Sequence, residues 1–511
     1  MKKENGKYSL YGNDLSAAKS RATDRWQQFF VRKFHYDPSE KYTLSTHSNN
    51  YLGQALGIKD ILRDNTGDPI SVKDSVVIST IRMGYGHYRI GMAGASCARA
   101  MGFTPLWLDL LAIPGITTDV INWCNVNYSY YSRISQRSKL FDKYIWEILT
   151  TGDPSLPILD TLLNNWIVTW PWRFLKTNIK DYKMSELFRN LYEALPSDMP
   201  MLTSHMWNCM GAVAGGMTNV VDMVFDNWPM AFQLTEGAKH GIQSPSAYYG
   251  FRTMRGFDDK GKIMKPAPED AVYFTGAHVD HELVENIEID CDARINRMKN
   301  NEPRRLLLTM GGAGAQRELF KAVIEYCLPL IKAGKVALFV NLGDHKGNWI
   351  WLQNELKDYT SSIETHFTWE DTKATADKLR DHPANGIHVF LHDNTFHAVY
   401  STNYLMRVID VMITKPSELA FYPVPKIFNA RVGGHEKWGA IRGAELGEGT
   451  VEANSIPQTL QAIDMLVNHN DLLEVFCECI VKNKSIGIYD GAYKCVELAT
   501  GKKWTRKLIL Q

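Results

Sequence analysis

Short apolar runs separated by glycine-rich turns organise the first half of the chain. Residues 75–80 read Ser-Val-Val-Ile-Ser-Thr, and a β-branched run of this length predicts a buried strand. The turn Met-Gly-Tyr-Gly-His follows, and an Ala- and Met-rich helix is expected over 88–101, where Gly102 ends it. Residues 106–110 supply the next apolar run. Strand, glycine turn, helix and strand together predict a βαβ unit.

The second half repeats this order. Residues 305–310 predict a strand, the turn Gly-Gly-Ala-Gly-Ala follows, and 316–333 predict a helix ended by Gly334. We therefore predict an α/β protein with two doubly wound, Rossmann-like domains. Other apolar runs predict further strands at 201–204, 230–234, 271–275, 336–340, 388–391 and 408–413.

The segments between these units set the expected domain boundaries. Residues 286–304 are polar and charged and end in Asn-Asn-Glu-Pro-Arg-Arg, which predicts a linker. We expect an N-terminal Rossmann-like domain over 1–290, a C-terminal one over 300–470 and a helical tail over 471–511.

An aromatic insertion interrupts the first domain at about residues 111–200, with helices expected around 141–149 and 159–166. Its Trp-rich stretch at 164–176 fits a packed helix pair. It also fits a surface that faces an acceptor or a membrane, because Trp, Lys and Arg favour the membrane interface.

Charge and cysteine content exclude several classes of protein. The 511-residue chain carries a formal net charge of +1, so no global field draws it to nucleic acid. Its eight cysteines contain no Cys-x-x-Cys pair, which argues against a zinc ribbon or a redox motif. The N-terminus lacks the apolar core of a signal peptide, and no run is long enough to span a membrane. We expect a cytoplasmic protein, with peripheral contact to a membrane left open.

Each glycine turn opens a helix, and backbone N–H groups at such a position attract phosphate. Neither turn is a known nucleotide fingerprint, because Tyr88 and Arg89 break the Gly-x-Gly-x-x-Gly pattern and no Gly-Lys-Ser/Thr follows. Two partial motifs in two α/β domains argue against a dehydrogenase. They indicate a cleft between the domains.

Residues 412–427 and 433–440 carry the most informative pattern. The first reads Met-Ile-Thr-Lys-Pro-Ser-Glu-Leu-Ala-Phe-Tyr-Pro-Val-Pro-Lys-Ile, and the second reads Gly-Gly-His-Glu-Lys-Trp-Gly-Ala. Together they resemble the donor-binding segment of the GT-B family that includes monogalactosyldiacylglycerol synthase and the lipid II GlcNAc transferase. Glu418 precedes Pro425 by the same spacing as the family's glutamate and proline. The loop between Lys415 and Glu418 is shorter than in that family.

The two glycine turns fit the same resemblance. Residues 83–87 are similar to the family's Gly-Gly-Gly-His loop, and residues 308–316 to its Met-Gly-Gly-Gly-Glu-Gly segment. The resemblance implies two Rossmann-like domains that face each other across a cleft. It implies an inverting glycosyltransferase that moves a sugar from a nucleotide sugar, with UDP expected, to a hydroxyl of a lipid or other acceptor. An epimerase or hydrolase of the same fold, or a non-catalytic nucleotide-binding protein, remains an alternative.

The resemblance also implies the donor-binding residues. Glu418 would accept hydrogen bonds from the ribose hydroxyls, since charge-assisted bonds suit a diol. Glycines of the turns would let backbone amides approach the diphosphate. Lys437 would offset the charge of the leaving group in place of a metal. The expected donor set is Gly84, Gly86, Gly311, Gly312, Gly314, Gln316, Thr414, Lys415, Ser417, Glu418, Gly434, His435, Glu436 and Lys437.

His87 is the expected catalytic residue. It lies at the start of a helix, and histidine titrates near neutral pH, which suits a base or a group that orients the acceptor hydroxyl. Asp109 follows the next strand and could orient His87 or act as the base itself. Glu236 and His240 are weaker candidates after a later strand.

We expect no metal ion and no cofactor apart from the nucleotide sugar. Asp290-Cys291-Asp292 spells a metal-binding Asp-x-Asp motif, but it lies in the predicted linker, and GT-B enzymes do not need that motif. His388, His392 and His397 do not share one face of a strand, so they do not fit a zinc site.

Overall fold

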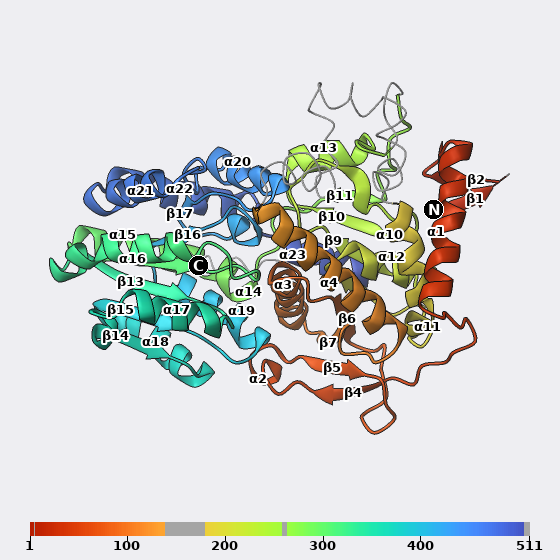
Figure 1. Cartoon of the computed structure of the whole chain (residues 1–511), viewed down its shortest axis with the longest axis horizontal. Helices are drawn as coiled ribbons and strands as arrows, with labels where there is room; N and C mark the ends of the chain where they lie inside the picture. The colour runs from red at the N-terminus through yellow and green to blue at the C-terminus, as the bar shows by residue number, and fades with distance from the viewer. Residues whose placement is uncertain (5, 138–178, 258–262, 505–511) are drawn as a thin grey trace.

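The computed structural model describes all residues except 5, 138–178, 258–262 and 505–511. Within the described residues, two sheets with helices packed around them lie side by side (Figure 1). The helices expected at 141–149 and 159–166 and the Trp-rich stretch at 164–176 lie outside the described residues.

The first domain is built on a sheet of eight described strands in the order β11-β10-β9-β8-β6-β7-β5-β4. All pairs are parallel except β4 with β5. The strands predicted from the apolar runs near residues 75, 106, 201 and 271 are confirmed. The strands are β4 (Ser45–Ser48), β5 (Lys59–Leu62), β6 (Ser75–Thr80), β7 (Thr104–Asp109), β8 (Met201–Thr203), β9 (Val220–Met223), β10 (Lys239–Ile242) and β11 (Val272–Phe274).

Helices cover both faces of this sheet, and a small antiparallel sheet precedes it. The central helix α3 (Gly86–Ala100) agrees with the predicted helix, and Gly102 follows it with a φ of 87°. The remaining elements are β1 (Lys2–Glu4), β2 (Lys7–Leu10), β3 (Asn13–Asp14), α1 (Ala17–Lys33), α2 (Gly53–Leu56), α4 (Ile116–Arg137), α10 (Ile179–Ser185), α11 (Arg189–Tyr192), α12 (Met206–Ala214), α13 (Pro245–Arg252) and α14 (His281–Glu285).

One predicted strand is wrong. The apolar run at 230–234 contains a short 3-10 helix, η3 (Ala231–Gln233), which packs against α13. The apolar side chains of this run are buried because η3 packs against α13, and not because the run pairs with a strand. The neighbouring strands β9 and β10 escaped prediction because Asp222 and His240 interrupt their apolar patterns.

The second domain is built on six described strands in the order β14-β15-β13-β12-β16-β17, all parallel. Its predicted strands are confirmed. The elements are β12 (Arg304–Thr309), α16 (Arg317–Lys332), β13 (Val336–Asn341), α17 (Lys346–Glu355), β14 (Ile363–His366), α18 (Trp369–Asp381), β15 (Gly386–Phe390), α19 (Thr395–Met406), β16 (Val411–Thr414), η5 (Glu418–Phe421), β17 (Lys426–Phe428), η6 (Gly434–Glu436), α20 (Lys437–Glu445), α21 (Ile456–Asn468) and α22 (Asp471–Ser485).

The predicted linker is a helix, α15 (Ile287–Lys299), so that expectation is wrong. Three of its charged residues, Asp290, Arg294 and Arg297, are buried. Arg294 donates to the carbonyl groups of Met406 and Ile409, and Arg297 pairs with Asp410. Buried guanidinium groups that are fully paired can lie in a core helix, although their charge makes the segment look like a linker.

The chain crosses between the domains a second time near its end. Helix α22 packs against α15 of the second domain, whereas α23 (Gly491–Thr500) packs against α3 and β9 of the first domain. In Figure 1, α23 lies among the elements of the first domain. Segments close to the two crossings are hydrogen-bonded to each other: the Ala277 amide donates to the Ile488 carbonyl (2.6 Å), and the Gly491 amide donates to the Ala277 carbonyl (3.0 Å).

Both glycine turns lie where the strand order of their sheet reverses. β6 lies between β7 and β8, and β12 lies between β13 and β16. Ligands of doubly wound sheets bind at such switch points, outside the carboxyl ends of the strands. The protein therefore has two Rossmann-like domains in the GT-B arrangement, and the predicted fold class is confirmed.

Candidate functional site

The two glycine turns meet at the domain interface. A β-carbon on Gly312 would lie 2.5 Å from the backbone nitrogen of Tyr85 and 2.8 Å from the Cα atom of Gly84. Only a residue without a side chain permits this approach of two backbones. The switch points of the two sheets therefore share one small region of the molecule.

Tyr85 latches the first turn onto the second domain. Its hydroxyl donates to Asp344 Oδ1 (2.6 Å) and accepts from the Asp344 amide (2.9 Å), while Arg82 pairs with Asp344 Oδ2 (2.7 Å). Burial and the Asp344 carboxylate raise the pKa of Tyr85, so the hydroxyl keeps its proton. The sequence analysis did not identify this latch, because nothing in the sequence connects residues so far apart.

Side chains of the second domain occupy two carbonyl groups of the second turn. A ring nitrogen of His345 lies 3.0 Å from the Gly311 carbonyl oxygen, and the Asn348 amide donates to the Gly314 carbonyl (2.9 Å). Gly314 has a φ of 63°, which favours glycine. The Gly314 amide donates to the Gly311 carbonyl (2.9 Å), so the turn is closed just before α16, where the N–H groups of a helix start favour an anion.

Lys415 lies across the second turn. A β-carbon on Gly311 would lie 2.7 Å from Lys415 Cε, and the Lys415 ammonium pairs with Glu436. Burial alone would raise the pKa of Glu436, but Lys415 and the Val432 amide hold it below its usual value. The structure thus unites two predicted donor residues, with Glu436 buried as the partner of Lys415.

Glu418 reaches across the interface to the first turn. A β-carbon on Gly86 would lie 3.7 Å from Glu418 Oε2, so the carboxylate lies beside the start of α3. Glu418 is the first residue of the four-residue 3-10 turn η5. Pro423 and Pro425 follow closely, and proline cannot continue a helix.

Other predicted donor residues shape the surrounding loops. Thr414 is buried at the end of β16, and the Ser417 amide donates to the Lys415 carbonyl (2.8 Å). Gln316 adopts a φ of 70° immediately before α16 and donates to the Ala430 carbonyl (2.5 Å). These three residues position the loops through backbone and loop contacts.

The loop before α20 contacts the first domain. Gly434 opens η6, and the His435 ring lies 6.5 Å from the ring of Trp228, measured between centroids. The Lys437 ammonium lies 5.7 Å from the ring centroid of its neighbour Trp438. His435 therefore faces the first domain, whereas Lys437 lies over its own helix.

His87 is buried in a fixed tautomer. Its Nδ1 atom lies 2.7 Å from the Ser204 carbonyl oxygen. Because a carbonyl group only accepts, Nδ1 carries the proton and Nε2 keeps a lone pair. Burial lowers the pKa of His87 to about 4, so the ring is neutral at pH 7. The rings of His205 and Phe225 pack against it, with centroids 4.6 and 4.4 Å away.

Asp109 does not orient His87, so that expectation is wrong. Its carboxylate accepts from the Tyr88 hydroxyl (2.5 Å) and the Leu111 amide (2.9 Å). The partner of His87 is instead the carbonyl of Ser204, which follows β8, whereas Asp109 ends β7. The two strands lie on opposite sides of β6, which separates the two residues.

Asp226 is a site residue that the sequence analysis missed. It follows β9 of the first domain, yet its charged neighbours belong to the second domain. Burial raises the pKa of Asp226 to about 6, and His435 and Lys415 oppose this rise while Glu436 and Glu418 add to it. The adjacent Asn227 donates to the Trp438 carbonyl (2.9 Å), which fixes this loop against the second domain. The available signal was an acidic residue directly after the apolar run at 220–225.

Two sequence families match the two parts of the chain, and the second match also includes β11 and α23, which belong to the first domain of the structure. Residues 9–253 match a family described as "Domain of unknown function (DUF6937)", and residues 267–500 match one described as "Domain of unknown function (DUF6938)". No curated protein matches the chain by sequence.

Several solved structures resemble the chain. A MnaA–UDP co-structure from S. aureus is 10% identical, covers 83% of this chain and 94% of that one, and has a TM-score of 0.41. A UDP-GlcNAc 2-epimerase from Neisseria meningitidis bound to UDP-GlcNAc is 10% identical, covers 63% and 82%, and has a TM-score of 0.38. An α,α-trehalose 6-phosphate synthase from Burkholderia multivorans is 10% identical, covers 63% and 76%, and has a TM-score of 0.36. By themselves these likenesses assign no activity.

Among the helices that the structure describes, none combines the length and the apolar content needed to cross a membrane.

Asp290 of the Asp-x-Asp motif and the histidines His392 and His397 each have a different partner. Asp290 pairs with Arg407 (3.2 Å). His392 lies 3.0 Å from the Thr372 hydroxyl, whereas His397 stacks on Trp369. Glu236, a weaker candidate, lies within reach of the Tyr11 amide (3.4 Å).

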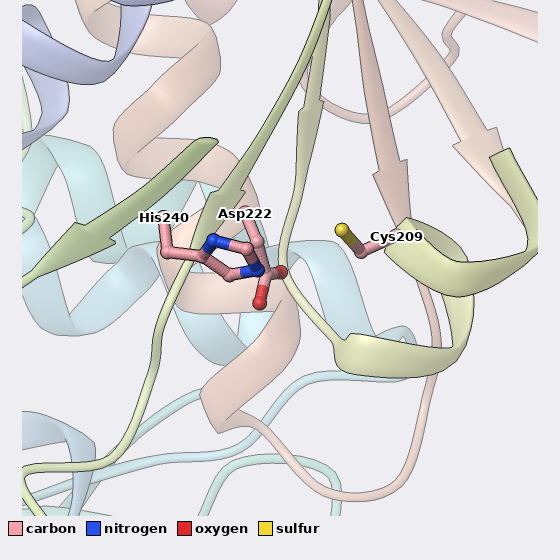
Figure 2. Close-up of side chains that lie close together, drawn as sticks. All are labelled: Cys209, Asp222 and His240. Carbon is pink, nitrogen blue, oxygen red and sulfur yellow. The ribbon is translucent and has the colours of Figure 1, made fainter. Parts of the chain in front are cut away.

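Cys209, Asp222 and His240 converge in the core of the first domain (Figure 2). His240 Nδ1 lies 2.9 Å from the Ala271 carbonyl oxygen, and its Nε2 atom accepts from the Thr235 amide (3.0 Å). Both ring nitrogens are therefore engaged, which leaves no lone pair for a metal ion or for catalysis. His240 is a structural residue, and its expected role in the site is wrong.

Asp222 gives this cluster a pH-dependent effect on stability. Burial raises the pKa of Asp222 to about 7, and one carboxylate oxygen has no hydrogen-bond partner. A raised carboxyl pKa means that the folded state binds the proton more tightly. The unfolding free energy therefore falls as pH rises from the unfolded pKa of about 4 to the folded value.

We expect Asp222→Asn to become more stable than wild type as the pH rises. Each unit of pKa corresponds to about 1.4 kcal/mol, and the asparagine carries no charge to bury. Urea unfolding at pH 5 and pH 8 measures the difference, with Asp68→Asn on the exposed surface as the control. An identical difference at the two pH values would show that Asp222 is ionised at both.

Proposed function

We propose that the protein binds a nucleoside-diphosphate sugar, with UDP as the nucleotide, and transfers the sugar to a hydroxyl acceptor. One observation carries the proposal. Lys415, Glu418 and the second glycine turn converge at the switch point of one sheet, directly against the switch point of the other sheet. A cation, a carboxylate and a turn rich in N–H groups suit a diphosphate and a ribose.

The donor would enter when the domains separate. The backbones of Gly312 and Gly84 touch, and Tyr85 holds Asp344 across the same interface. A diphosphate between the turns therefore requires this contact to open, as in hinge motions around many ligands. The described conformation then corresponds to a closed, donor-free state.

The second domain would hold the donor. In this proposal Glu418 accepts from the ribose hydroxyls, and the amides of the second turn and Gly434 contact the phosphates. Lys415 is already paired with Glu436, so its ammonium would interact with both Glu436 and the diphosphate. His435 in η6 and Lys437 at the start of α20 would contact the sugar or phosphate. Charge stabilisation by such groups replaces a metal ion at the leaving group.

The first domain would activate the acceptor. Asp226 has a pKa of about 6, nearer to neutral pH than the pKa of His87 at about 4, so Asp226 is the better general base. His87 offers the Nε2 lone pair to the acceptor hydroxyl and thereby orients it. The proposed acceptor is a hydroxyl group of a lipid or of another compound, as the resemblance implies.

A panel of UDP- and GDP-sugars tests the function directly. We expect slow release of free sugar from one UDP-sugar, because many transferases let water replace the acceptor. Chromatography of the products distinguishes three outcomes. Released sugar and UDP support cleavage of the donor by a transferase or a hydrolase, an epimerised donor supports an epimerase, and binding without turnover of any donor contradicts catalysis.

Glu418→Ala tests the ribose contact. We expect the affinity for UDP to fall by at least about 1 kcal/mol, the scale of one hydrogen bond to a charged group. Isothermal titration calorimetry measures the change in affinity. Glu445→Ala, at an exposed position of α20, is the matched control. If UDP binds a folded Glu418→Ala protein as tightly as wild type, Glu418 does not hold the ribose.

Asp226→Asn tests the general base. A base must be ionised, so kcat/KM of the wild type should fall as the pH drops below about 6. The substitution should lower the rate by about 10²–10⁴-fold and remove this acid limb, while UDP affinity is kept. The control variant Asp222→Asn replaces another buried carboxylate, on the preceding strand β9, and should retain the acid limb of the pH profile. An unchanged limb in Asp226→Asn would assign the titration to another group.

A further inference from the structure

We infer that Glu364, His366 and His388 form a binding site for a divalent cation of the zinc class. The three residues lie on the edge strand β14 of the second sheet and on its neighbour β15. Glu364 and His366 are two positions apart on β14, and the register pairs Glu364 with His388 on β15. Alternate residues of a strand share one face, so all three side chains lie on the same side of the sheet.

The ligand atoms are spaced as in a metal site. His366 Nε2 lies 3.2 Å from His388 Nδ1, Glu364 Oε2 lies 3.5 Å from His388 Nδ1, and Glu364 Oε1 lies 3.8 Å from His366 Nε2. Ligands that are 2.0–2.1 Å from one tetrahedral zinc ion are separated from each other by roughly 3.3 Å. One ion can therefore contact all three side chains with little movement.

Neighbouring groups fix the tautomers of both histidines. His366 Nδ1 lies 2.9 Å from Asp371 Oδ2, and His388 Nε2 lies 2.9 Å from the Asn385 carbonyl oxygen. Both partners are acceptors, so these two nitrogens carry the ring protons. The facing atoms, His366 Nε2 and His388 Nδ1, then each present a lone pair.

Two lone pairs at this distance repel unless a positive charge lies between them. A carboxylate that orients a histidine in this way is a common feature of metal sites. Either a cation joins the two nitrogens or an extra proton makes one ring an imidazolium. A metal ion would accept both lone pairs and would also lie within reach of the Glu364 carboxylate, which faces both rings.

The site is rigid on one side and open on the other. His366 is only 1% exposed and stacks on Phe390 (4.6 Å), while His388 stacks on Phe339 (5.1 Å). The Glu364 side chain is 65% exposed, which gives an ion a path of entry and leaves a coordination position for water. Two imidazoles and one carboxylate favour Zn²⁺, Co²⁺ or Ni²⁺ over Mg²⁺ and Ca²⁺, which prefer oxygen ligands.

A cation at this position would fasten the edge of the second sheet. It would join β14 to β15, and Asp371 would couple it to the first turn of α18. This role concerns stability and is independent of the proposed sugar transfer.

The full-length protein, stripped with a chelator and dialysed, tests the site with Zn²⁺ alone. We expect one equivalent to bind by calorimetry and the Tm to rise with zinc. Co²⁺ should give the visible absorption of a low-symmetry site. His366→Gln and His388→Gln should weaken binding at least about 100-fold, and Asp371→Ala about 10–100-fold, as outer-shell changes do. His392→Gln, a nearby buried histidine with a different partner, should bind as wild type.

Two results would overturn the proposal. In one, the stripped wild-type protein binds no zinc, which means that a proton lies between the rings. In the other, zinc binds equally to wild type and to folded His388→Gln, which places the ion elsewhere. Because loss of a buried histidine can unfold the domain, Glu364→Gln provides a second test at an exposed position. It should keep the metal-free Tm of wild type and lose at least about 10-fold in zinc affinity.

Discussion

The close backbone approach of the two glycine turns is the constraint on which the rest of the site depends. Gly312 fits against Gly84 and Tyr85 only because it has no side chain. This contact joins the switch points of two sheets that belong to different domains. Every charged group of the candidate site, from Lys415 and Glu418 to Asp226, is placed relative to it. A larger residue at Gly312 would separate the two halves of the site without touching any of those groups.

Burial at this interface determines which groups can take part in proton transfer. His87 and Asp226 both lie among apolar rings or opposing charges, and burial moves their pKa values in opposite directions. The histidine becomes a neutral acceptor of hydrogen bonds, and the carboxyl group becomes a base that titrates close to neutral pH. Pairs of titratable groups with diverging pKa values are characteristic of active sites. The same physical effect makes Asp222 a purely structural carboxyl group, because its neighbours are core residues.

The sequence predicted the repeated elements well and the contacts between them poorly. Both strand–turn–helix units follow from apolar runs and glycine turns, since these signals are local. The role of Asp226 was hidden because Asp222 interrupts the strand that precedes it. The partner of His87 is a backbone carbonyl, which no side-chain pattern encodes. His388 was considered together with His392 and His397, whereas its real neighbours come from β14, and only the strand register brings them together. The second glycine turn and Lys415, both predicted to bind the donor, do lie together, because the parallel pairing of β12 and β16 brings the ends of these strands side by side.

The second crossing of the chain has a mechanical consequence. The segment before α14 and the segment before α23 are hydrogen-bonded to each other close to the places where the chain passes between the domains. Both connections stay intact when the domains separate, so the opening that donor entry requires would be a rotation about the region of residues 277 and 488. Such a rotation would return the backbone of Gly312 to the same contact with Gly84 and Tyr85 on closing.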